Sequence, residues 1–343
     1  MISIDQSSAF VGLDYHSSFI QVCVLDASGK VLGNRRITND VTAIQRYVGE
    51  ASRGRVLMGG AVEACCGSSN LAEQLRKADW NIHLAHAGVC SKMKQNPDKT
   101  DLGDAHLLAD LCRVGYLPRV WLPPSDIRDL RRLVRYRQQL VDQRRDVKLR
   151  IRAMLREERI AAPQEAAKPW TRAWLLWLES VELPEHSRWI MDNHIQDLHR
   201  LIKQIAVTEQ KMEEATQDDP VVEKLRTIKG VGLVTAVVMR AEIGEFSRFT
   251  SGKQLARYCA VTPRNASSGS RQADAGLIKA GNLPLRTIIM ECAHRLARYH
   301  PKWKQLKERL VLTGKARSVA AAAVANRWIR KLHWEMKEQS LAA

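Results

Sequence analysis

Apolar and polar positions along the first third of the chain predict a β-sheet combined with helices. Apolar runs over 9–14 and 55–63 are typical of buried strands, and FIQVCVLD (19–26) alternates with the period of two expected of a strand. Further strands are expected over 31–37 and 81–86, and helices over 41–48, 71–78 and 99–111. A meander of strands followed by alternating helix and strand indicates an α/β domain, to which we assign residues 1–118.

The pattern changes to a helical period in a middle region, residues 119–217. The stretch 126–159 holds twelve Lys or Arg and six acidic residues, and apolar residues recur every seven positions. Arg137 and Arg144 interrupt the repeat, so we expect an imperfect coiled coil. Two apolar tracks are visible: Leu133, Leu140, Val147 and Met154, and then Met191, Ile195, Leu198, Ile202, Ile205 and Met212. The second track predicts a helix that folds back as an antiparallel partner or meets another subunit.

Residues 218–343 predict a third, mainly helical domain. Gly230 and Gly232 lie in a turn between two apolar helical stretches, as in a helix-hairpin-helix module, whose backbone N–H groups can hold a phosphate. A simple turn between helices is the alternative. The segment 258–286 is rich in Ser, Gly, Asn and Arg, which predicts a loop with little core, and helices follow to residue 343.

Composition adds a partner class to this outline. Lys and Arg number 54 against 37 Asp and Glu, which gives a net charge of +17 and favours a nucleic acid over other partners. No apolar run approaches the ~18 residues of a membrane-spanning helix, and no signal peptide is visible, so we expect a cytoplasmic protein without a membrane partner. Seven cysteines without a CxxC pair argue against a disulfide framework or a zinc ribbon.

Four carboxylates are expected to meet at one end of the first domain. Asp14 and Glu63 close two of the predicted strands, while Asp101 and Asp104 are three residues apart and share one face of a helix. Acidic residues in a first helical turn also favour the helix dipole, and Asp101 could simply cap the helix. Four clustered carboxylates repel one another unless a cation lies between them, and oxygen ligands indicate Mg²⁺, with Mn²⁺ as the alternative. With the predicted fold included, the metal site is the favoured hypothesis.

Hydroxyl and cationic side chains are concentrated in two further stretches. Ser267, Ser268 and Ser270 lie in the loop of the third domain, where one of them could attack a phosphodiester held by cations; a flexible linker is the alternative. The candidate nucleic-acid contacts, besides Gly230 and Gly232, are Arg128, Arg131, Arg132, Arg135, Arg264, Arg271, Lys279 and Arg286. For the four arginines at 128–135, which share one helical face, a plain solvated face is nearly as plausible.

In this order the motifs resemble those of the insertion-sequence 110 family of transposases, which includes site-specific DNA invertases and recombinases guided by a bridge RNA. The matching elements are GLD at Asp14, VEA at Glu63, KTDxxDA at Asp101 and Asp104, the GVG turn, and TPR, SG, KAGN and LR between Thr262 and Arg286. The resemblance covers nearly the whole chain, and KTDxxDA combined with the late SG and KAGN elements is its specific part.

The resemblance implies an α/β RNase H-like (RuvC-like) domain whose four acidic residues bind Mg²⁺, a helical coiled-coil middle, and a mainly α C-terminal transposase domain with a serine nucleophile. By motif match the nucleophile is Ser268, next to Gly269, with Ser267 and Ser270 as rivals. It further implies a covalent phosphoserine link to DNA, a structured non-coding guide RNA, a homo-oligomer (a dimer, or a tetramer in the synaptic complex) and a place at the bacterial nucleoid.

Two departures and two alternatives accompany this interpretation. The family often has a Thr-Gly pair after VEA, where this chain has Cys65, Cys66 and Gly67, and the loop between Gly269 and Lys279 is slightly short. One alternative is a Holliday-junction-type metal-dependent DNA nuclease, in which the serine loop only binds DNA. The other is a non-enzymatic basic protein that binds nucleic acid.

Overall fold

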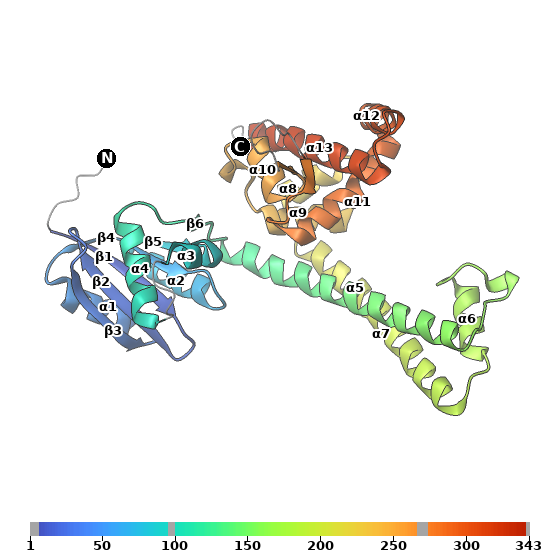
Figure 1. Cartoon of the computed structure of the whole chain (residues 1–343), viewed down its shortest axis with the longest axis horizontal. Coiled ribbons are helices and arrows are strands. Elements are labelled where there is room, and N and C mark those ends of the chain that lie inside the picture. Colours follow the sequence, from blue (N-terminus) through green and yellow to red (C-terminus); the bar gives the residue numbers. More distant parts are fainter. Residues whose placement is uncertain (1–6, 95–99, 266–273, 341–343) are drawn as a thin grey trace. The chain divides into compact units, whose positions relative to one another are not determined.

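The computed structural model describes residues 7–94, 100–265 and 274–340, which form two compact units, Met1–Pro123 and Pro124–Ala343. The first unit holds a six-stranded sheet and the second is built almost entirely from helices (Figure 1). The three-part division at 118 and 217 stays a prediction.

The sheet of the first unit has the strand order β3-β2-β1-β4-β5-β6. The first three strands form an antiparallel meander, β4 and β5 run parallel to β1, and β6 is antiparallel at the edge. The strands are β1 (Ser8–Tyr15), β2 (Phe19–Asp26), β3 (Val31–Thr38), β4 (Val56–Glu63), β5 (Ile82–Ala85) and β6 (Arg119–Val120). This mixed sheet with its helices is consistent with the RNase H-like domain expected from the sequence.

Helices cover both faces of the sheet. Successive side chains of β1 point to opposite faces, and apolar residues on each face pack against helices. Leu13 and its neighbours on one face pack with α1 (Val41–Ser52) and α2 (Ser68–Lys77). On the other face, Phe10 packs in a core with Leu108 of α4 (Asp101–Arg113). Figure 1 shows α4 crossing the blue strands. Two short elements were not predicted, α3 (Ala87–Met93) and β6, since neither is long enough to show a period.

The N-terminus of α4 corrects the capping alternative for the carboxylate pair. Thr100 is the N-cap, and its hydroxyl accepts a hydrogen bond from the Gly103 N–H at 3.2 Å. Asp101 and Asp104 both lie inside the first turn. Because a hydroxyl already satisfies the helix end, neither carboxylate is needed as its cap.

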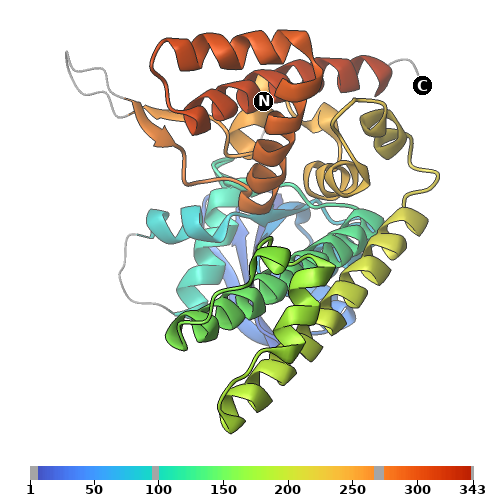
Figure 2. The same cartoon turned by 90° about the vertical axis from the view of Figure 1, so that its right-hand side faces the viewer.

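The second unit begins with two long helices that pack side by side in opposite directions (Figure 2). They are α5 (Ser125–Glu157) and α7 (Glu185–Glu214). A 3₁₀ turn (Gln164–Ala166) and α6 (Arg172–Ser180) connect them, and Trp170, Trp174 and Trp177 pack into their core. Arg137, predicted to interrupt the seam, instead pairs across it with Glu209 at 2.6 Å.

The prediction that Ile202 belongs to the buried track of α7 is wrong. Ile202 is 42% exposed, while Leu201 beside it is 1% exposed and packs in the core. Met191, Leu198 and Ile205 are buried and seven residues apart. The buried residue between the first two, Ile195, comes four residues after Met191, but the one between the last two, Leu201, comes three residues after Leu198. An ideal helix drifts against a strict seven-residue repeat, so the buried stripe moves by one position along α7.

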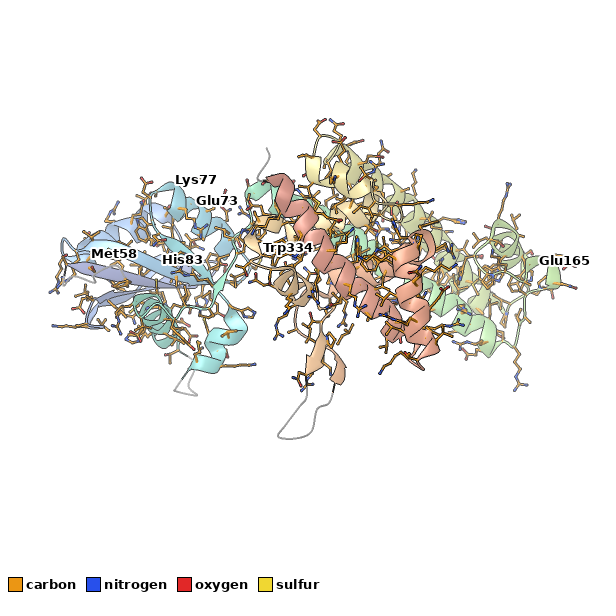
Figure 3. All side chains as sticks on the ribbon, turned by 90° about the horizontal axis from the view of Figure 1, so that it is seen from above. Met58, Glu73, Lys77, His83, Glu165 and Trp334 are labelled. Carbon is orange, nitrogen blue, oxygen red and sulfur yellow. The ribbon has the colours of Figure 1, made fainter. Side chains whose placement is uncertain are left out.

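The remaining helices of the second unit surround a single core that also includes Val134 of α5. The elements are α8 (Pro220–Arg226), α9 (Leu233–Ile243), a 3₁₀ turn (Phe246–Arg248), α10 (Gly252–Tyr258), α11 (Leu283–Tyr299), α12 (Pro301–Leu312) and α13 (Arg317–Ser340), with the two-stranded β7 (Pro263–Asn265) and β8 (Asp274–Leu277). Trp334 lies on the outer side of α13 and is 53% exposed (Figure 3). Among the described helices, none is long and apolar enough to cross a membrane.

Candidate metal centre and nucleic-acid contacts

Asp14 and Asp101, predicted as metal ligands, lie together with a histidine. The His16 Nε2 atom is 3.2 Å from the Asp14 Oδ2 atom and 3.5 Å from the Asp101 Oδ1 atom. One ligand atom of each of these three residues lies within 4.8 Å of the others. The group therefore has the compactness of a cation site, with two carboxylates and one imidazole.

Cationic side chains also contact these acids. Arg36 of β3 holds the Asp101 Oδ2 atom at 3.0 Å and stacks its guanidinium 4.2 Å from the centre of the Phe19 ring, on which the His16 ring also stacks. Lys94 forms an ion pair with Asp104, which is only 8% exposed. Charge on this end of the domain is thus neutralised by β3 and by the end of α3.

The position of α4 depends on Gly12 in the GLD motif. A Cβ atom at this position would lie 2.0 Å from the Ala105 carbonyl oxygen and 2.5 Å from the Ala109 nitrogen. The backbones of β1 and α4 therefore touch directly, which no other residue type permits here. This close approach places the first turn of α4 beside the end of β1, where Asp14 lies.

Glu63 ends β4, which runs parallel to β1 with Leu13 paired to Val62. Burial raises the pKa of the Cys65 thiol, hydrogen bonds with Ser68 lower it, and the charges of Glu63 and Asp14 raise it. Glu63 is not a member of the compact three-residue group, nor is Asp104. Of the four predicted ligands, the structure thus brings Asp14 and Asp101 into one group and places the other two on the adjoining strand and helical turn.

Electrostatics at Asp14 agree with clustered acids. Burial raises the pKa of the Asp14 carboxyl above its ordinary value, His16 lowers it by its charge and hydrogen bond, and the charges of Asp104 and Asp101 raise it. A divalent cation would relieve this mutual repulsion. The carboxylate oxygens suit Mg²⁺ or Mn²⁺, whereas the imidazole of His16 is a ligand more typical of transition metals. The carboxylates therefore fit the ion class predicted from the sequence, and His16 departs from an oxygen-only ligand set.

Sequence reasoning did not include His16. The available signal was its position two residues after Asp14, directly beyond the end of β1. The contact with Asp101 had no such signal, since it joins residues 85 positions apart by way of the fold.

The predicted contacts in the C-terminal loop are only partly described. Ser267, Ser268, Ser270 and Arg271 lie outside the described residues. Arg264 on β7 and Lys279 are exposed, as a phosphate contact requires. Arg286 instead donates a hydrogen bond to the Ile278 carbonyl at 3.1 Å.

Two of the four α5 arginines bind a buried carboxylate. Glu242, at the end of α9, is fully buried, and Arg135 holds it with two hydrogen bonds of 2.8 and 3.0 Å. Arg131 donates to the carbonyls of Ala241 and Glu242, and Asn282 donates to the Glu242 carboxylate at 2.7 Å. Any phosphate contact by Arg131 or Arg135 would compete with these bonds.

The other predicted contacts are more open. Arg132 is exposed and lies 3.4 Å from Asp129, and Arg128 is half-buried with a partner of its own. Gly230 has a positive φ of 105° in the turn before α9, and its carbonyl accepts a hydrogen bond from Arg295 at 2.8 Å. Gly232 caps α9 through its backbone. Whether this turn holds a phosphate stays a prediction.

Comparison with known proteins finds two family models that match different parts of the chain. A family model for the DEDD domain of IS110 enzymes, described as a transposase, matches residues 11–159, and a model described as transposase of the IS116/IS110/IS902 family matches residues 222–308. The chain belongs to the IS110 family of transposases. The first match covers Asp14, Glu63, Asp101 and Asp104, so the group around His16 lies in the DEDD domain of an IS110 transposase.

Several curated transposases resemble the chain. A putative transposase y4qE of Sinorhizobium fredii is 33% identical over 213 residues, which is 60% of this chain and 49% of the relative. The transposase for insertion sequence element IS1111A of Coxiella burnetii is 24% identical over 88% of this chain and 81% of its own length. The transposase for IS1328 of Yersinia enterocolitica is 24% identical over 81% of this chain and 83% of its own length. The chain thus spans about half of the first relative and about four fifths of the others.

Proposed function

We propose that this member of the IS110 transposases cuts and rejoins DNA, using the carboxylates of the first unit with a divalent cation and Ser268 as the nucleophile. The observation that supports the proposal is the group of Asp14, His16 and Asp101 within 4.8 Å of one another, inside the family's DEDD domain. Glu63 and Asp104 complete the proposed ligand set. When bound, Mg²⁺ or Mn²⁺ would supply a Lewis acid for phosphoryl transfer.

The covalent step uses the serine hydroxyl. The Oγ atom of Ser268 attacks the phosphorus of a DNA phosphodiester and loses its proton to a nearby base, while the bond from phosphorus to one deoxyribose oxygen breaks and that oxygen takes up a proton. The phosphoserine bond replaces the broken ester bond, so a second deoxyribose hydroxyl can reverse the reaction and rejoin the strand. Exposed Arg264 and Lys279 are suited to bind the phosphate.

A structured non-coding RNA is the proposed guide. The chain carries a net charge of +17, and α5 exposes several arginines, including Arg132 and Arg145. Such a charge suits contact with a phosphate backbone, which DNA and RNA share. The resemblance to bridge-RNA-guided recombinases supports RNA as the second of them.

Self-association is part of the same proposal. Leu149 on α5 is 53% exposed, and Val207 and Trp189 on α7 are 51% and 68% exposed. Apolar side chains repeated along an exposed helical pair favour contact with a second copy of the chain. We propose a dimer that forms a tetramer when two DNAs are held together, with the carboxylates and the serine of one reaction supplied by different protomers.

The test is a search for protein covalently attached to labelled element DNA on a denaturing gel, with Mg²⁺ and the element's non-coding RNA. The adduct should form with the native chain and disappear in Ser268→Ala and in Asp101→Asn. Asp110→Asn is the matched control, because Asp110 lies on the same helix and pairs with Arg113 at 2.6 Å, away from the carboxylate group.

Other outcomes would change the proposal in defined ways. Cleavage without an adduct that survives Ser268→Ala would replace it with the metal-dependent nuclease. Loss of the adduct in Ser267→Ala or Ser270→Ala but not in Ser268→Ala would move the nucleophile. DNA binding without any strand cleavage, unaffected by Asp101→Asn, would support a non-enzymatic nucleic-acid-binding protein.

A further inference from the structure

A cavity in the second unit lies between α10, the β7–β8 pair and α13. Its volume is about 750 Å³, within the range of pockets that bind small molecules. Small apolar residues, among them Ala256, Val261, Ala322 and Ala323, form most of its surface. None of the predicted site residues lines it.

Four cations line the same cavity. Lys253 comes from α10, Lys315 precedes α13, and Arg327 and Arg330 lie on α13. All four are exposed, and none forms an ion pair with another described residue. Among the described lining residues there is no carboxylate. A ligand with an apolar body and negative charge at its edge would match this arrangement.

A polar atom without a partner lies in the wall. The Oγ1 atom of Thr262 is buried and makes no hydrogen bond to any described group. Asn326 also lines the cavity and donates one hydrogen bond to the Val261 carbonyl at 3.1 Å. Because this hydroxyl is closed off from the accessible surface, the polar group that can meet a ligand is the Asn326 amide, whose oxygen and second N–H can bond to a polar edge. The wall therefore favours a polar-edged ring over a purely hydrocarbon ligand.

The cavity is rigid on one side. Gly252 begins α10, and a Cβ atom there would lie 2.6 Å from the Arg330 carbonyl oxygen and 2.9 Å from its Cα. The backbones of α10 and α13 therefore pack directly against each other. Such contact fixes the distance between the two walls, so the cavity is present before a ligand binds.

The cationic surface continues beyond the cavity. Arg327 also borders a second hollow of about 450 Å³ on α12, where Lys302 and Arg309 lie. Cations on both sides of one arginine suit several phosphates in a row rather than a single one. A small anionic metabolite would leave the second hollow unused.

We propose that this cavity binds one unpaired nucleotide of the DNA strand, with its base among the alanines and the flanking phosphates on the cations. A paired base cannot enter, because its edge is turned into the duplex. Arginine planes can stack on a base, and the side-chain amide of Asn326 can hydrogen-bond to its edge. DNA is favoured over RNA because Thr262 and Pro263 precede Ser268 by six and five positions in the chain. This choice rests on the proposed function.

The test measures affinity for short DNA in the absence of divalent cations, with 2-aminopurine at successive positions of a single strand. Ala323→Leu fills the cavity and should weaken single-strand binding about tenfold while leaving duplex binding unchanged. The matched control is Ala215→Leu, an exposed alanine at the end of α7, which should bind like the native chain. Aminopurine fluorescence should rise at one strand position only in the native chain and the control.

An abasic strand gives a readout that does not depend on the variant's folding. Removing the base at the fluorescent position should weaken binding to the native chain as much as Ala323→Leu does, and combining the two changes should add nothing. Equal weakening of single-strand and duplex binding by Ala323→Leu, or no position with an abasic effect, would overturn the proposal. An RNA of the same sequence that shows the effect more strongly would overturn the choice of DNA.

Failure of this inference is distinguishable from failure of the proposed function. If the Ala323→Leu variant binds single strands normally and still forms covalent adducts, the nucleotide-binding role of the cavity is rejected and the serine mechanism is kept. Cavity-dependent binding by a chain that never forms adducts would reject the serine mechanism alone.

Discussion

At the residue scale, the site depends on contacts that a single side chain can abolish. Asp14 and Asp101 approach each other because β1 and α4 touch at Gly12. His16, in the turn after β1, and Arg36 on β3 then reach the carboxylates. The spacing of Asp14, Asp101 and Asp104 was visible in the sequence. The roles of Arg36 and Lys94 were not, because ion pairs between distant positions leave no periodic signal.

Replacing Gly12 with alanine should separate β1 from α4. A Cβ atom 2.0 Å from the Ala105 carbonyl oxygen forces the helix outward, and we expect the free energy of unfolding to fall by about 1–3 kcal/mol. Adduct formation should fall further than stability predicts, since the first turn of α4 carries two carboxylates. Urea denaturation and the denaturing-gel assay measure the two effects.

Gly49→Ala is the control for this change. Gly49 is exposed within α1, and nothing lies within 4 Å of a Cβ atom built there. Because alanine is a better helix former, this variant should be more stable by roughly 0.5–1 kcal/mol. If Gly12→Ala were as stable as the native chain, the direct contact between β1 and α4 would be disproved.

At the element scale, the sequence predicted which segments are helical but not what their polar faces bind. The seven-residue repeat predicted the α5–α7 pair, although the actual seam includes Leu201 in place of Ile202. Arg131 and Arg135 share a face of α5, which suggested phosphate contacts. Their buried partner, Glu242, is more than a hundred positions away, and only the fold shows that it faces them.

Glu242 makes the stability of the second unit depend on acid pH. Burial raises the pKa of its carboxyl, but the hydrogen bonds and charges of Arg135, Asn282 and Arg131 outweigh this effect and lower the pKa below its ordinary value of 4.5. The folded chain then binds fewer protons than the unfolded chain. Its stabilisation is therefore complete above pH 4.5 and is lost as the pH falls through the lowered pKa.

Glu242→Gln should remove this dependence. At pH 7 the variant should be less stable by about 1.5–3 kcal/mol, the contribution of a hydrogen bond to a charged group, and the difference should shrink as the pH falls. Denaturant unfolding across the acid range measures it, with Glu179→Gln on the exposed side of α6 as the control. A difference that is constant with pH would show that Glu242 acts through packing alone.

At the scale of the whole molecule, charge is the property that the sequence predicts best, because it needs no fold. The excess of 54 Lys and Arg over 37 Asp and Glu is fixed by composition. The sheet order and the division into two units depend on contacts between distant parts of the chain. The periodic patterns predicted the strands and helices but could not predict how they pair. The cavity between α10 and α13 had no sequence signal, since its lining combines short segments from four elements.

DNA binding by the whole chain should weaken steeply with salt. If six or more phosphates are neutralised, affinity should fall roughly a thousandfold or more between about 50 and 200 mM salt. Fluorescence anisotropy with duplex DNA measures the slope, and replacing chloride with glutamate separates anion effects from cation release. A nearly flat response would contradict extensive contact with the phosphate backbone.

The bonds around Glu242 also have a mechanical consequence. Arg135 ties the first third of α5 to the end of α9, and the same carboxylate binds Asn282, whose side chain caps the first turn of α11. A force that twists α5 about its axis must therefore either break the two-pronged arginine contact or turn the start of α11 with it. The long helix is in this sense a lever connected to the start of α11, which comes after the serine loop and β8 in the chain.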